Sequence, residues 1–124
     1  MTVSSVGHKG QILPELRGAD LSGMDLSGMD LSGMDLSGCN FRESVLSGAD
    51  LSDCNLSGCN FRGTDLSGAR MNGSRMRGAC LSGADLSHCV LSGADLSDCD
   101  LSDAQMHGAD LTGIIVTTRK GYVR

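Results

Sequence analysis

Apolar residues recur at every fifth position along almost the whole chain. From position 16 to position 116 each fifth residue is leucine, phenylalanine, methionine or valine, in 21 consecutive units without an insertion or deletion. An α-helix turns by about 100° per residue and a strand alternates its faces every second residue, so neither brings residues five apart onto one face. A chain that turns by the same angle at each unit, however, points all these side chains at one axis.

A second, longer period gives the size of that angle. The segment LSGCNFR occurs at residues 36–42 and again at 56–62, a shift of 20 residues or four units. Four turns of about 90° close a square, which predicts that Phe41 stacks on Phe61 as a core pair. The expected separation is about 4.8 Å, the spacing of neighbouring strands, so the 21 units make about five coils in a rod about 25 Å long.

The other positions of each unit suit such a coil. The residue two places before each centre is mostly small and is predicted to face inward with the centre. Glycine, or aspartate at positions 53, 98 and 103, occupies the second place after most centres, where a turn requires small or turn-compatible residues. The aspartate before and the serine after the centre are predicted to face solvent.

Units such as ADLSG, CNFRG and ADLSD resemble the A(D/N)LXX repeat of the pentapeptide-repeat family. The resemblance implies an all-β fold, a right-handed quadrilateral parallel β-helix. We divide the chain into an N-terminal cap at residues 1–13, the β-helix at 14–118 and a C-terminal tail at 119–124. Met24, Met29 and Met34 depart from the repeat by filling a position usually held by a small residue. We interpret them as packing across the open first coil, with a methionine-rich partner or soft-metal patch as the alternative.

The sequence offers little that indicates catalysis or a cofactor. Five of the six cysteines occupy the small inward position, where a thiol is a compact filler, and only Cys80 falls in an outward position. His88 and His107 are expected near one another on adjacent coils but lack a third metal ligand. We therefore predict no enzymatic activity, no cofactor and no metal. With no long apolar stretch and no secretory signal core, the chain is expected to be cytoplasmic and not membrane-bound.

The charges are distributed in three zones. Residues 15–60 carry a net charge of −6 and residues 81–113 a net charge of −6, whereas residues 61–80 carry a net charge of +3. The four arginines of the middle zone are candidate partner-binding residues: Arg62, Arg70, Arg75 and Arg77. The alternative is charge relief within the coil, with Arg70 beside Asp50 and Arg75 beside Asp95.

We predict that the chain is a non-enzymatic scaffold that binds a protein partner and makes no direct contact with nucleic acid. The resemblance adds an alternative, since some family members mimic DNA and bind the topoisomerase DNA gyrase, which they inhibit or protect from quinolones. A third hypothesis makes the serine rows a recognition plane for ice or another crystalline ligand. We also expect a two-fold homodimer through the last coil, with candidate interface residues Ile114, Ile115, Val116, Tyr122 and Val123.

Overall fold

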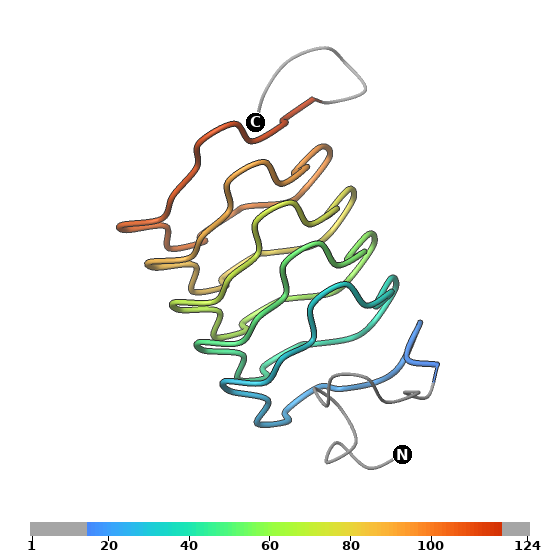
Figure 1. The fold of residues 1–124 in the computed structure, drawn as a ribbon. Coiled ribbons are helices and arrows are strands. Elements are labelled where there is room, and N and C mark those ends of the chain that lie inside the picture. Colours follow the sequence, from blue (N-terminus) through green and yellow to red (C-terminus); the bar gives the residue numbers. More distant parts are fainter. Residues whose placement is uncertain (1–14, 118–124) are drawn as a thin grey trace.

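Neighbouring coils are joined by bridges between residues that lie 20 apart. The structure, a computed structural model, describes residues 15–117. Within this range it has no helix and no extended strand, and its β-structure consists of sixteen isolated parallel bridges from Asp20↔Asn40 to Asp95↔Ile115. The predicted square coil with a 20-residue repeat is therefore confirmed. Coils follow one another along the rod from the N-terminal to the C-terminal end (Figure 1).

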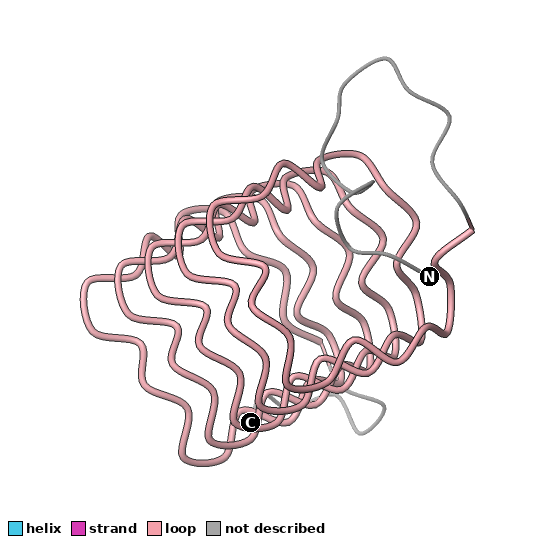
Figure 2. Cartoon of the chain, turned by 90° about the horizontal axis from the view of Figure 1, so that it is seen from below, coloured by secondary structure: helices cyan, strands magenta, loops and turns pink. Residues whose placement is uncertain are grey.

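The rod has five complete coils with four faces each. The coils comprise residues 15–34, 35–54, 55–74, 75–94 and 95–114, and residues 115–117 begin a sixth. We name the faces by their first central residue, face A by Leu16, face B by Leu21, face C by Leu26 and face D by Leu31, and later coils repeat them at steps of 20. Seen at right angles to the first view, the coils lie in register with one another (Figure 2).

Every backbone N–H of a typical unit has an acceptor. In the unit 49–53, Ala49 donates to the preceding unit of its own coil at 3.0 Å and Asp50 to the previous coil at 2.8 Å. Leu51 and Asp53 donate to the next coil at 2.6 and 3.0 Å. The remaining N–H, that of Ser52, donates to the Asp50 carboxylate at 3.0 Å. The coil thus satisfies its backbone donors without continuous strands, as a buried backbone requires.

The corner of each unit forces a left-handed backbone. The second residue after each centre has a positive φ, and where the sequence has no glycine the same conformation is adopted by Glu43, Asp53, His88, Asp98 and Asp103, with φ between 57 and 60°. Turns with a positive φ at their third residue favour glycine because a Cβ is strained there. This requirement explains why glycine dominates the position.

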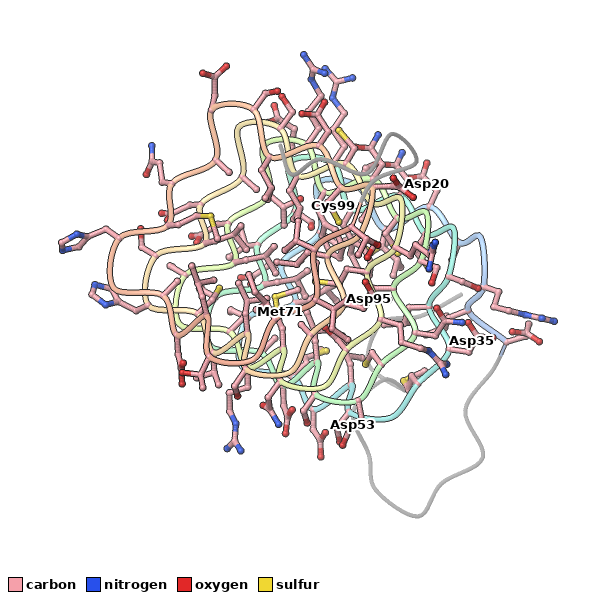
Figure 3. The ribbon with its side chains drawn as sticks, turned by 90° about the horizontal axis from the view of Figure 1, so that it is seen from above. Asp20, Asp35, Asp53, Met71, Asp95 and Cys99 are labelled. Carbon is pink, nitrogen blue, oxygen red and sulfur yellow. The ribbon has the colours of Figure 1, made fainter. Side chains whose placement is uncertain are left out.

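The central side chains fill the interior of the coils. The centres of the first four coils are at most 2% exposed, and the Phe41 and Phe61 rings stack with centroids 5.0 Å apart and an interplanar angle of 2°. Figure 3 looks along the rod and shows Met71 inside the coils and Asp53 at their outer edge. The apolar centres therefore form one continuous column, with the charged side chains around it.

Several small inward side chains, the five buried cysteines and Thr64, donate a hydrogen bond to the previous coil. The Cys39 thiol donates to the Leu16 carbonyl at 2.9 Å and the Thr64 hydroxyl to the Phe41 carbonyl at 2.6 Å, each across to the previous coil. In the first coil three of the four such positions are held by Met24, Met29 and Met34, which are partly buried and pack against the core. Their contacts support the interpretation of these methionines as packing residues.

No helix in residues 15–117 is long and apolar enough to cross a membrane. The predicted cap at 1–13 and tail at 119–124, together with Tyr122 and Val123, lie outside the described residues.

We expect the cost of truncating a central leucine to depend on its coil. Leu66 is fully buried in the third coil, so Leu66→Ala should lower the free energy of unfolding by about 2–5 kcal/mol through lost contacts and a cavity. Leu111 in the last complete coil is already 40% exposed, so Leu111→Ala should cost only about 1 kcal/mol. Urea unfolding followed by circular dichroism measures both, and equal costs would contradict a core that is open at its C-terminal end.

Candidate functional site

The C-terminal end of the rod exposes apolar side chains. Leu111 is 40% and Ile115 50% exposed, the largest exposures of bulky apolar residues in the described range. Leu101, Met106 and Val116 are only partly buried, although the corresponding residues of the inner coils are at most 2% exposed. The first coil differs, because its four central leucines, Leu16, Leu21, Leu26 and Leu31, are at most 2% exposed. This end is therefore a candidate interaction surface among the described residues.

Within residues 15–117, several central N–H groups at this end have no carbonyl acceptor. In the inner coils each central N–H donates to a carbonyl of the next coil, as Leu81 does to Asp100 at 2.7 Å. Among residues 15–117, no carbonyl accepts from the N–H groups of Leu101, Met106 and Leu111. An edge of unpaired donors next to exposed apolar side chains is a template for pairing with another chain.

The structure places three of the predicted dimer residues at this end. Ile114 and Val116 are partly buried against the core and Ile115 is half exposed. The sequence prediction missed Leu111, because its position in the repeat marks it as a core residue. Only the absence of a following coil within residues 15–117 exposes it.

The four arginines predicted as a partner-binding belt occupy three different faces. Arg62 lies on face B, Arg70 on face D, and Arg75 and Arg77 on face A, so they encircle the rod instead of forming one patch. Arg70 pairs by a bridge with Asp50, and Arg75 with Asp95, which is the register expected for charge relief. The Arg77 guanidinium lies 4.0 Å from the Asp98 carboxylate.

Face B carries an arginine pair that the sequence analysis passed over. Arg42 and Arg62 follow Phe41 and Phe61 in the repeated segment LSGCNFR, so they occupy the same position in neighbouring coils. They border a hollow of about 480 Å³ that is open to solvent and is also lined by Asn60 and Cys80. The signal was present in the sequence, because the 20-residue shift that stacks the phenylalanines also stacks the arginines.

The outward aspartates are structural caps as well as charges. Thirteen units have aspartate or asparagine before the centre, and in all thirteen its side-chain oxygen accepts from the N–H two residues later. The Ser27 hydroxyl donates a second hydrogen bond to the Asp25 carboxylate at 2.7 Å. These hydrogen bonds, the hydroxyl first, lower the pKa of Asp25. The sequence analysis had treated both residues only as solvent-facing.

The cysteines divide as the repeat predicts. Cys39, Cys54, Cys59, Cys89 and Cys99 are buried, and all six cysteines are free thiols. Burial raises the pKa of Cys54 and Cys99 to about 11 and that of Cys59 and Cys89 to about 12, which keeps them protonated. Cys80 alone is partly exposed.

The two histidines on face C lie side by side. The rings of His88 and His107 meet edge to face, with centroids 5.7 Å apart. In the part of the chain that the structure describes, no group of three or more histidine, cysteine, aspartate or glutamate residues is placed to hold a metal ion.

The parallel coils with four faces each form a quadrilateral β-helix. The family model for pentapeptide repeats matches residues 15–53, 44–83 and 79–117 in eight copies. The chain belongs to the pentapeptide-repeat family.

Solved structures of the family resemble this chain. The pentapeptide repeat protein Rfr23 from the cyanobacterium Cyanothece 51142 is 24% identical, with a TM-score of 0.57 over 81% of this chain and 86% of that one. A pentapeptide repeat protein from the Arabidopsis thaliana thylakoid lumen is 30% identical, with a TM-score of 0.49 over 86% and 72% of the two chains. QnrB1, a plasmid-mediated fluoroquinolone resistance protein, is 24% identical, with a TM-score of 0.33 over 79% and 60%. Among curated proteins, none matches the sequence.

We expect the Asp25 cap to respond to loss of the Ser27 hydroxyl. Ser27→Ala removes the larger of the two hydrogen bonds that lower the pKa of Asp25, so this pKa should rise toward its ordinary value of 3.8. The pKa of Asp25 is lower in the folded than in the unfolded chain. The cap therefore contributes its full stabilisation at a pH above the unfolded-state pKa, and this stabilisation is lost as the pH falls through the folded-state pKa. An NMR titration of the carboxyl carbons measures the shift, with Ser47→Ala beside Val45 as the control. An unchanged Asp25 pKa would contradict the assigned hydrogen bond.

Proposed function

We propose that the chain is a non-enzymatic scaffold that binds another protein through the C-terminal end of its rod. The observation that carries this proposal is the combination of exposed Leu111 and Ile115 with N–H donors at the same end that have no carbonyl acceptor within residues 15–117. Apolar contacts supply the association energy, and the open donors fix the register of an added strand.

The partner that binds this end is a second copy of the chain, which forms a two-fold, end-to-end dimer. A two-fold axis brings the same surface of both copies together, so each Ile115 meets the apolar end of its partner. Such a dimer doubles the rod and presents each charged face twice. The lateral faces then remain available to a protein of another kind.

The DNA-mimic hypothesis is favoured by one observation, the ionised aspartates around the rod. All 15 acidic residues lie in the described range with six arginines, and hydrogen bonds lower the pKa of Asp20, Asp35 and Asp85 among others. Duplex DNA carries one charge per about 1.7 Å, a density that would require about fifteen net negative charges on a rod of this length. The six arginines reduce the match, so we place gyrase binding second to scaffolding.

We expect the full chain to be a dimer in solution and to lose dimerisation when the end is charged. Ile115→Glu buries a carboxylate in the interface and should give the monomer mass by light scattering with size-exclusion chromatography. Asn55→Glu is a matched control, because it adds the same charge in the same column of face A, where Glu15 is native. This control should remain a dimer.

A monomer at high micromolar concentration of the wild-type chain would contradict docking between copies. The same three proteins, titrated into a gyrase supercoiling assay with and without a quinolone, test the alternative. Inhibition or protection that is equal in all three would favour the aspartate faces over the end as the functional surface.

A further inference from the structure

The hollow on face B presents hydrogen-bond donors and no carboxylate. Arg42 and Arg62 border it, Asn60 and Cys80 lie in its lining, and the corner glycines at 58 and 78 leave the opposite side without side chains. Its volume of about 480 Å³ is within the range of small-ligand sites. Its lining therefore suits a small anion or a negatively charged group on a larger molecule.

Among residues 15–117, no ion pair of 4.0 Å or less joins Arg42 or Arg62 to a carboxylate. Each of the other four arginines in residues 15–117 has a carboxylate beside it: Arg17 has Glu15 and Asp35, Arg77 has Asp98, and Arg70 and Arg75 have Asp50 and Asp95 as bridge partners. Arg42 and Arg62 instead occupy equivalent positions in neighbouring coils, with Ser22 and Ser82 at the next places in their column. Like charges on adjacent strands destabilise the pair.

One carboxylate lies near the pair without closing the hollow. The Glu43 side chain extends over Gly63 at the far corner of face B, on the other side of the arginines from Asn60 and Cys80. No ion pair of 4.0 Å or less joins Glu43 to either arginine among the described residues. The hollow itself is lined by positive and neutral groups.

The cap residues two places before Arg42 and Arg62 also favour an anion in the hollow. Ten of the thirteen caps are aspartates, but Asn40 and Asn60 cap the units that carry Arg42 and Arg62. The Oδ1 atom of each asparagine accepts the N–H of its arginine at 3.0 Å, so the Nδ2 donors are left for other partners. The cap is kept while the negative charge is removed, next to the arginines that an aspartate would neutralise.

We propose that this hollow binds a phosphate group, either free or as the monoester of a phosphorylated side chain. A phosphate group carries between one and two negative charges at neutral pH and has three acceptor oxygens, so it matches two guanidinium groups and the Asn60 amide together. A single carboxylate would leave one of the two arginine charges uncompensated. The site does not depend on docking at the C-terminal end, because face B is lateral.

Cys80 supplies a built-in reporter for the test. It is the partly exposed cysteine in the hollow, and the other five are buried, so a thiol reagent at neutral pH should label this residue in the folded chain. Inorganic phosphate and O-phosphoserine, each titrated at constant ionic strength, should slow the labelling of Cys80 saturably and shift the NMR signals of the Arg42 and Arg62 side chains. Chloride at the same ionic strength should do neither.

Three variants separate the site from general charge effects. Arg42→Ser with Arg62→Ser should weaken phosphate binding at least about tenfold, because each arginine supplies charged hydrogen bonds, and serine is native at Ser22 and Ser82 of the same column. Asn60→Asp keeps the cap and both arginines but should weaken binding by a similar factor. Arg75→Ser with Arg77→Ser removes the same charge from face A and should leave binding unchanged.

The binding and labelling results identify the source of the phosphate group and show whether the hollow binds it. Tighter binding of O-phosphoserine than of inorganic phosphate identifies a phosphorylated side chain as the source, and equal binding identifies free phosphate. Protection of Cys80 that is absent, not saturable, or lost equally in the face A variant overturns the site.

Discussion

The whole structure depends on giving each backbone N–H of a five-residue unit an acceptor. A chain that turns at every unit cannot form continuous strands, so its donors are divided among the coil before, the coil after, the preceding turn and one side chain. This division fixes the sequence: a glycine or tolerant residue at the positive φ, a small inward residue, and an aspartate or asparagine that caps the next turn. Serine then supports the cap. Few positions remain free to vary for function.

The same constraint explains why function is expected at the end and at departures from the pattern. An inner coil leaves no typical donor open, but Leu101, Met106 and Leu111 have no next coil in the described range to accept from them. On face B, by contrast, asparagine replaces aspartate and arginine replaces serine, and the hollow there keeps a positive charge. In a repeat this regular, each departure from the rule is a candidate for selection by a partner or ligand.

Much of the fold was predictable because both periods are visible in the sequence. The shift of LSGCNFR by 20 residues predicts the Phe41–Phe61 stack, and the bridges have that spacing throughout. The exposure of Leu111 was not predictable from its position in the repeat, since that depends on what lies above it. The cap role of the aspartates was also missed, because hydrophobic patterning says nothing about hydrogen bonds between a side chain and its own turn. The Arg42–Arg62 pair was within reach of the same 20-residue shift.

Amide hydrogen exchange, followed residue by residue, tests the central claim most directly. In dilute protein, the central N–H groups of Leu51 and Phe61 should exchange slowly and those of Leu101 and Leu111 much faster, since only the former donate to a following coil. At high concentration the last coil should become protected as a second copy covers it. Equal protection of both pairs in dilute protein would contradict the open end, and an unprotected last coil at every concentration would contradict its role in docking.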